Sequence, residues 1–267
     1  MSEKNKLNED WWDKNPMTYE DWDLPEDERS LKNEEKFKNI NSAYMQSNPY
    51  LVDVFENFKN EGNQENVVLD IGCGWGTSTV MLSKIFKKVH SIDISTKSIG
   101  ATKDNVNLNG NPERVDLSKF DAEKLNFNNF FDQVYSWGVI HHSHDTNQIL
   151  RNLHKALKEN GKCLIMIYHK NSLRYYLKGL YYLIFKLKIF LGHNLDSVQK
   201  FFTDGFYHTH YTKSELRKIL SDIGFKNISF DVTHMEPAYL PFSKKNSFID
   251  KFLKKNFGWL LVAKFTK

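Results

Sequence analysis

The sequence has few cysteines, and their positions give no sign of a disulfide framework or a metal site. Only Cys73 and Cys163 occur among the 267 residues, which is too few for a small fold stapled by disulfides. Neither belongs to the closely spaced pairs that hold structural zinc. We therefore expect a hydrophobic core to stabilise the chain, which is long enough for one large domain with additions.

Long apolar runs at the start and long basic runs anywhere are also missing. The first residues, M-S-E-K-N-K, carry no apolar signal region, so the cytoplasm is the expected location. No Lys/Arg run reaches the length of a nucleic-acid tail. The net charge is +4, but residues 1–28 hold ten Asp or Glu against three Lys, a balance of −7 that leaves +11 on the remainder. A solvated lysine-rich surface explains this excess most simply, although nucleic acid, an anionic membrane or a phosphorylated small molecule would also match it.

What the sequence does have is a glycine-rich turn between an apolar run and a helix start. The segment V-V-L-D-I-G-C-G-W-G-T-S-T spans Val67 to Thr79, with glycines at positions 72, 74 and 76. Glycine lets the backbone take positive φ and lets a ligand approach without meeting a Cβ atom. The first N–H groups of the following helix would face that ligand. The G-x-G-x-G spacing differs from dinucleotide and phosphate-loop fingerprints, and alone it also fits a plain structural turn.

Three further strand-like segments follow at regular intervals. The first, Val89 to Ile94, contains Asp93, 17 residues after Gly76, where an acidic residue can accept hydrogen bonds from ribose hydroxyls. The second segment, 114–117, is followed by Asp121-Ala122. The third, 131–137, is followed by His141-His142. Strands that alternate with helices predict a parallel, doubly wound sheet with its ligand site at the carboxyl ends of the strands.

Together these segments resemble the class I methyltransferases that use S-adenosylmethionine. The matching parts are L-D-I-G-C-G-W-G, S-I-D-I-S, F-D-A-E-K-L and F-D-Q-V-Y-S-W-G-V-I-H-H-S-H-D. They cover residues 67–169 well and the C-terminal strands less well. The resemblance implies an α/β fold with a Rossmann-like seven-stranded sheet, helices on both faces and a final antiparallel strand. It also implies S-adenosyl-L-methionine as the cofactor and S-adenosyl-L-homocysteine as the product.

The resemblance further implies roles for individual residues. The three glycines would line the methionine part of the cofactor, and Asp70 would fix the turn that carries them. Asp93 would hold the ribose, while Asp121 and the Ala122 backbone would contact the adenine amine. The predicted cofactor-binding set is Asp70, Gly72, Gly74, Gly76, Asp93, Ile94, Asp121, Ala122 and Trp137.

The candidate catalytic residues are histidines and a tyrosine. His141 and His142 follow the fourth strand, where the family places its acceptor-side motif, and imidazole suits a general base near neutrality. Some similar O-methyltransferases use such a pair as the base and others carry it without needing it, so orientation or packing is the alternative. Further candidates are Tyr168, His169, His208 and His210.

The chain is expected to comprise four parts. Residues 1–30 form an acidic arm whose tryptophans, at positions 11, 12 and 22, set it apart from a disordered tail. The arm either orders over the active-site mouth or packs on the surface. Residues 31–170 hold N-terminal helices and the cofactor-binding core, residues 171–211 a helical cap insertion, and residues 212–267 the rest of the core.

The insertion contains a helix-like pattern of leucines and isoleucines. Leu173, Leu177, Leu180, Ile184, Leu187 and Leu191 repeat at helical spacing. Three lysines in 175–191 cost more than its apolar residues gain, so a membrane span is disfavoured. We expect a cap over the substrate, with peripheral contact to an anionic lipid surface as the alternative.

The predicted function is metal-independent methyl transfer to a small-molecule acceptor, at a hydroxyl of a sugar, lipid precursor or secondary metabolite. No nucleic-acid substrate is expected, because the fourth strand is followed by S-W-G-V and not by the D/N-P-P-Y/F motif of DNA adenine methyltransferases. The alternatives are an N-methyltransferase, a membrane-associated lipid methyltransferase and a non-catalytic S-adenosylmethionine-binding protein. The oligomeric state is left open.

Overall fold

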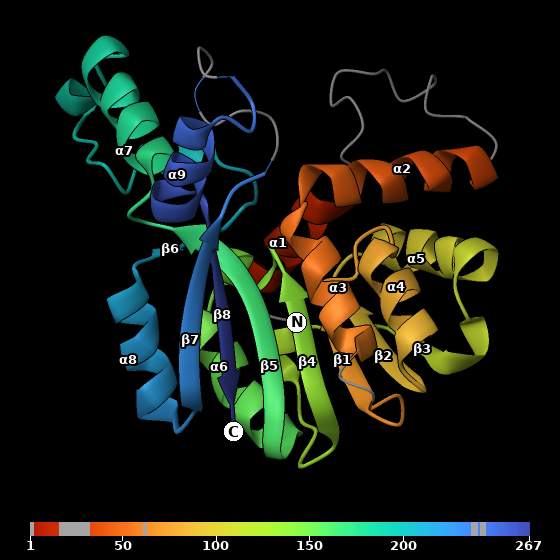
Figure 1. Cartoon of the computed structure of the whole chain (residues 1–267). Helices are drawn as coiled ribbons and strands as arrows, with labels where there is room; N and C mark the ends of the chain where they lie inside the picture. The colour runs from red at the N-terminus through yellow and green to blue at the C-terminus, as the bar shows by residue number, and fades with distance from the viewer. Residues whose placement is uncertain (1–2, 16–32, 61–62, 236–239, 241–243) are drawn as a thin grey trace.

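A mostly parallel β-sheet runs through the molecule with helices on both faces (Figure 1). The structure is a computed structural model and describes residues 3–15, 33–60, 63–235, 240 and 244–267. The strand order is β3-β2-β1-β4-β5-β8-β7. Strands β1 to β5 are parallel, and β8 lies antiparallel between β5 and β7. This confirms the predicted class of fold; a short β6 beside β5 makes the sheet eight-stranded rather than seven-stranded.

The elements have the following bounds. The strands are β1 (Val67–Ile71), β2 (Lys88–Asp93), β3 (Val115–Lys119), β4 (Phe131–Trp137), β5 (Leu157–His169), β6 (His210–Tyr211), β7 (Lys226–Thr233) and β8 (Leu260–Thr266). The α-helices are α1 (Glu3–Lys14), α2 (Asn33–Ser47), α3 (Tyr50–Asn60), α4 (Thr77–Ile85), α5 (Thr96–Asn109), α6 (Thr146–Ala156), α7 (Leu173–Leu180), α8 (Lys213–Ile223) and α9 (Phe248–Phe257).

Local signals in the sequence set where several helices begin and end. The Ser95 side chain accepts a hydrogen bond from the Ser98 N–H at the start of α5, and Asp145 does the same for Gln148 at α6. Thr212 and Glu215 form a reciprocal capping box at α8, which ends at a left-handed Gly224. Helix α6 ends at Ala156, because the chain is already extended as β5 from Leu157.

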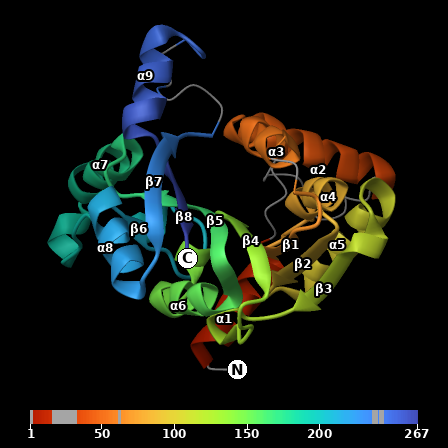
Figure 2. The ribbon, with the colours of Figure 1, turned by 60° about the horizontal axis from the view of Figure 1, so that its bottom comes forward.

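Two apolar clusters hold the sheet between its helical layers (Figure 2). One lies between the sheet and helices α6 and α8, and contains Leu150, Ile165 and Leu220. The other lies on the opposite face against α3 and α4, and contains Phe55 and Leu82. Burial on both faces explains why β1 and β8 are mostly apolar, whereas the edge strands β3 and β7 are more polar and more exposed. The arrangement leaves the carboxyl ends of the strands as the place where polar side chains meet.

Candidate functional site

The glycine-rich turn after β1 has the backbone that the sequence predicted. Gly72, Gly74 and Gly76 all have positive φ, at 75°, 55° and 87°. A Cβ atom on Gly72 would lie 2.2 Å from a methyl of Val139, and one on Gly76 would lie 2.9 Å from the Thr102 Cα. A Cβ atom on Gly74 would meet nothing within 4 Å. Packing therefore requires glycine at positions 72 and 76, whereas at position 74 the glycine keeps space open.

Asp93 at the end of β2 is tied to this turn. Its Oδ2 accepts a hydrogen bond from the Gly74 N–H at 2.9 Å, and its Oδ1 accepts one from the Ser95 N–H at 2.8 Å. Burial raises the Asp93 pKa to about 6, against the opposing effect of these backbone hydrogen bonds. The carboxylate still faces the pocket that the turn borders, so it can accept further hydrogen bonds there.

Asp70 ties the turn to the start of α4 through hydrogen bonds. It is almost fully buried, and its carboxylate accepts hydrogen bonds from the hydroxyls of Thr79, at 2.6 Å, and Ser78, at 3.2 Å. Burial raises its pKa to about 6. Asp70 does not line the pocket, and neither does Gly76. Both residues hold the turn in this structure, and their place in the cofactor-binding set stays a prediction.

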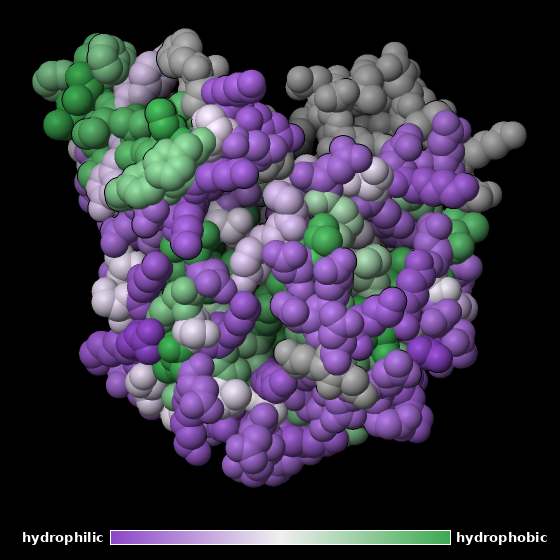
Figure 3. Space-filling view, viewed as in Figure 1, coloured by the Kyte–Doolittle hydropathy of each residue, from purple (hydrophilic) through white to green (hydrophobic). Residues whose placement is uncertain are grey.

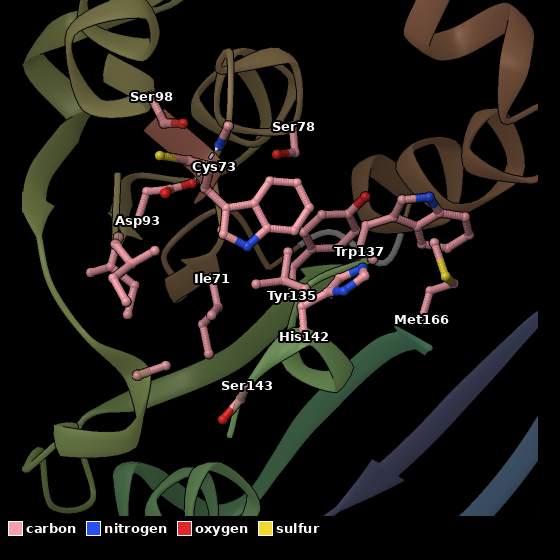
Figure 4. A pocket seen from close by; sticks show the side chains of 18 of the residues that line it. Ile71, Cys73, Ser78, Asp93, Ser98, Tyr135, Trp137, His142, Ser143 and Met166 are labelled. Carbon is pink, nitrogen blue, oxygen red and sulfur yellow. Dashed lines mark hydrogen bonds between the residues drawn. The ribbon is translucent and has the colours of Figure 1, made fainter. Parts of the chain in front are cut away.

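A single pocket at the carboxyl ends of the strands brings together most of the predicted site residues (Figure 4). Of those residues, the following line it: Gly72, Gly74, Asp93, Ile94, Asp121, Ala122, Trp137, His142 and Tyr168. Figure 4 shows Asp93 and Cys73 toward one end, Trp137 and Met166 toward the other, and His142 with Tyr135 between them. A polar end near the turn thus continues into an aromatic and apolar end.

The histidines of the sequence run have different environments. His142 lines the pocket, and its Nδ1 lies 2.8 Å from the Tyr207 carbonyl oxygen. A carbonyl can only accept, so this contact places the ring proton on Nδ1 and leaves Nε2 with a free electron pair. Burial lowers the His142 pKa to about 4. The ring is therefore neutral at pH 7.

The other candidate histidines do not line the pocket. His141 is fully buried, neither ring nitrogen has a hydrogen-bond partner among the described residues, and burial lowers its pKa well below the usual value. His169 is buried with its Nδ1 3.0 Å from the Gly258 carbonyl oxygen. His208 and His210 lie next to each other, with ring centroids 5.8 Å apart, and neither lines the pocket. Of the predicted bases only His142 and Tyr168 can meet an acceptor there.

Helix α1 contributes residues that the sequence predicted only in outline. Asn8 and Trp12 line the pocket, and the Trp12 ring lies 5.1 Å from the His142 ring. Asp13 accepts a hydrogen bond from the Ser95 hydroxyl at 2.5 Å, and Glu9 is paired with Lys119. The tryptophans in an acidic arm were the signal for this placement. Residues 16–30 of that arm lie outside the described residues.

The insertion at 171–211 differs from the expected cap. None of its described residues lines the pocket. Its regular helix, α7, ends at Leu180; a π-helical turn at Tyr181–Phe185 and a left-handed Leu187, with φ 54°, break the leucine repeat. The predicted face is largely exposed, as at Leu177 and Ile184. What the insertion does provide is the Tyr207 carbonyl that orients His142.

The pocket fits an adenosyl amino-acid ligand. The space above Gly74 is open, as a backbone-contacting ligand requires. The Asn8 Oδ1 and the Trp75 Nε1 are buried at the pocket and have no hydrogen-bond partner within the part of the chain that the structure describes, so an acceptor and a donor are available there. Among the described residues no group of three or more His, Cys, Asp or Glu could hold a metal ion. Metal independence remains a prediction.

The fold is that of the class I methyltransferases that use S-adenosylmethionine. Residues 69–165 match the family described as a methyltransferase domain. This part of the chain is a methyltransferase domain, which confirms the enzyme class and the cofactor predicted from the sequence.

Named relatives and solved structures agree with this assignment. The chain is 25% identical over 172 residues to the ubiquinone biosynthesis O-methyltransferase of Pelagibacter ubique, covering 64% of this chain and 65% of that protein. It is 35% identical over 105 residues to phosphoethanolamine N-methyltransferase 2 of Caenorhabditis elegans, covering 39% of this chain but 24% of that protein. The chain thus spans less than two thirds of these relatives. The fold is similar to that of magnesium protoporphyrin IX methyltransferase from Synechocystis with bound S-adenosylhomocysteine, with a TM-score of 0.58 at 16% identity over 98% of this chain and 99% of that one.

Proposed function

We propose that the protein transfers a methyl group from S-adenosylmethionine to a hydroxyl of a small-molecule acceptor, with His142 as the general base. The observation that supports this proposal best is the fixed tautomer of His142. Its Nδ1–H donates to the Tyr207 carbonyl, and the ring borders the same pocket as Gly74 and Asp93. A neutral imidazole with a free Nε2 can accept the proton that a hydroxyl loses as its oxygen bonds to carbon.

The cofactor would lie along the polar end of the pocket. Its sulfonium supplies an already activated methyl group. Gly74 would let the methionine part approach the backbone, and Asp93 would accept hydrogen bonds from the ribose. Asp121 and Ala122, which line the same pocket, would contact the adenine. The chain's residues then mainly hold acceptor and donor in line, which is the principal need of a displacement at carbon.

The walls near His142 indicate what kind of acceptor would fit. Trp137 is held by a hydrogen bond from its Nε1 to Asn48 Oδ1, at 3.0 Å, and its ring stacks on that of Tyr50. Met166, Met235 and Leu260 also line the pocket, and they pack in the apolar cluster that contains Trp137. These side chains favour an acceptor with an apolar or aromatic body over a bare sugar. A relative that is named as a ubiquinone biosynthesis enzyme is consistent with an acceptor of this kind.

The test replaces His142 by Gln and supplies candidate hydroxyl acceptors with methyl-labelled cofactor. We expect kcat to fall by about 10²–10⁴-fold, since glutamine cannot accept the proton. The affinity for S-adenosylhomocysteine should stay close to that of the wild type. His144→Gln is the matched control, because His144 belongs to the same run but is exposed and does not line the pocket.

Three results would contradict the proposal or part of it. Unchanged kcat in His142→Gln with an oxygen-methylated product would show that His142 is not the base, and Tyr168 would be tested next. A loss of tenfold or less with a nitrogen-methylated product would indicate an amine acceptor, which needs less help with its proton. Binding of S-adenosylhomocysteine without turnover on any acceptor would favour a non-catalytic protein.

A further inference from the structure

Two helical segments expose a large amount of apolar surface. We call this surface the apolar patch and define it as the exposed apolar side chains of residues 176–191 and 248–257. Its most exposed members are Phe248, Phe190 and Phe185, at 84%, 82% and 75% exposure. Leu191, Ile249 and Phe252 are exposed as well. Single exposed apolar residues are ordinary, but a concentration of large ones marks an interaction surface.

Both segments lie at one end of the molecule. Figures 1 and 2 place α9 next to α7 at the end of the sheet where β6 lies. Figure 3 shows hydrophobic side chains gathered over this end, whereas the lower part of the same view is mostly hydrophilic. This is the carboxyl end of the parallel strands. The patch and the pocket therefore share one side of the molecule.

The patch is bordered by an excess of positive charge. Residues 170–210 hold six Lys or Arg against two Asp, and residues 244–257 hold five Lys against one Asp. Two of these three acids are already engaged: Asp250 is buried and paired with Lys254 at 3.1 Å, and Asp196 lies 3.3 Å from Lys170. The lysines also sit close to the aromatic rings, as Lys188 does over Phe201 at 4.5 Å. Apolar side chains and cations are thus interleaved.

Interleaved aromatic, aliphatic and lysine side chains are typical of a surface that lies in a membrane interface. Lysine stems can reach along apolar surface while the ammonium groups meet lipid phosphates. A second copy of the chain fits this surface less well, because a symmetric contact would bring the two sets of lysines together. No helix among the described residues is long and apolar enough to cross a bilayer. The contact would therefore be peripheral.

The patch also has direct connections to the pocket. Met235 and Leu260, which precede and follow α9 along the chain, both line the pocket. Arg174 of α7 lies over the Trp259 ring, 4.7 Å from its centroid, beside Leu260. If the protein docked through α7 and α9, the apolar end of its pocket would thus face the surface to which it is docked.

We propose that the apolar patch docks the protein onto an anionic lipid bilayer. The docking uses no residue of the catalytic or cofactor-binding set. Its test is therefore independent of the test of the proposed chemistry. The aromatic side chains enter the interface, and the surrounding lysines bind the lipid phosphates.

Co-sedimentation with vesicles tests this proposal on the full chain. The wild type is mixed with phosphatidylcholine vesicles that contain phosphatidylglycerol, and with vesicles of phosphatidylcholine alone. We expect binding to the anionic vesicles, weaker binding to the neutral ones, and a decrease with salt. Phe185→Glu/Phe190→Glu should reduce the binding about tenfold or more, since carboxylates replace the two inserted rings and meet anionic lipid.

The matched control is Val52→Glu/Leu108→Glu, which makes the same change at exposed apolar residues of α3 and α5, outside the patch. It should bind vesicles as the wild type does. Affinity for S-adenosylhomocysteine is measured on each variant and should be unchanged, which shows that each variant is folded. Absence of wild-type binding to anionic vesicles would overturn the proposal, and so would an equal loss in both double variants. A wild-type dimer that Phe185→Glu/Phe190→Glu disperses, without vesicle binding, would show instead that the patch joins two copies.

Discussion

At the scale of single residues, the site depends on side chains that the surrounding backbone holds in one state. The Tyr207 carbonyl fixes the His142 tautomer, and burial keeps the ring neutral. Asp93 is fixed in the same way by the N–H groups of Gly74 and Ser95. Such preorganisation matters because a base must already be oriented when the acceptor arrives.

The pH dependence of turnover follows from the lowered pKa of His142. A base acts in its neutral form, and burial lowers the pKa from 6.5 to about 4, so the neutral form persists as the pH falls. With saturating cofactor, we predict that kcat stays nearly constant from about pH 8 to about pH 5 and falls only below that. A steady-state pH profile on the folded enzyme measures this. An acid limb with a midpoint near the ordinary imidazole value would contradict the burial of this base.

At the scale of elements, the strands and the glycine turn were predictable, and the reason is physical. Buried parallel strands are short apolar runs, and the turn between β1 and α4 requires glycines that no other residue replaces. Asp93 and Asp121 could be singled out because they lie at or shortly after the end of a strand, and both line the pocket. Periodicity was less informative for 173–191, since it indicates which residues share a helix face but not whether the helix continues or what covers it. Helix α9 was not predicted either.

The sequence left two positions open for the arm, over the pocket or on the surface, because the choice depends on contacts with residues far along the chain. Asp13 is one such link: its carboxylate accepts from the Ser95 hydroxyl at 2.5 Å and from the Lys97 N–H at 3.2 Å. Trp75, Tyr135 and Met166 also line the pocket, but the sequence did not predict this. Their spacing along the chain does not distinguish a side chain in a pocket wall from one in the core.

Replacing Asp13 by Asn should loosen α1. The amide is a weaker acceptor than the carboxylate, and Asn8 and Trp12 of the same helix line the pocket. We predict a loss of about three- to tenfold in affinity for S-adenosylhomocysteine, together with faster amide exchange in α1. Asp10→Asn is the control, because Asp10 pairs only loosely with Lys6, at 4.0 Å on the helix surface. Equal effects of the two substitutions would show that α1 does not depend on the Asp13 contact.

At the scale of the whole molecule, buried titratable groups link stability to pH. Burial lowers the pKa of His142 to about 4, of His234 to about 3 and of His210 to about 2, and that of His141 falls well below 6.5. Burial raises the pKa of Asp70 and Asp93 to about 6. Between about pH 5 and 6 the unfolded chain holds protons on most of these four histidines, while the folded chain holds them mainly on the two carboxylates.

The unfolded state therefore binds more protons in this range, so the free energy of unfolding should fall on acidification. The net difference of about two protons corresponds to on the order of 1–3 kcal/mol for each pH unit. Urea unfolding of the ligand-free protein at pH 7 and at pH 5 measures it. A free energy of unfolding at pH 5 equal to or above that at pH 7 would show that the carboxylates outweigh the histidines.

The most direct test of the central claim, that S-adenosylmethionine binds over the glycine turn, compares two glycines. Gly74 and Gly192 both have positive φ, at 55° and 78°, and at both an added Cβ would meet nothing within 4 Å. Alanine therefore brings similar backbone strain to each, but only Gly74 lines the pocket. Titration calorimetry with S-adenosylhomocysteine should show a loss of about tenfold or more for Gly74→Ala and wild-type affinity for Gly192→Ala. Wild-type affinity in both variants would contradict the placement of the cofactor over this turn.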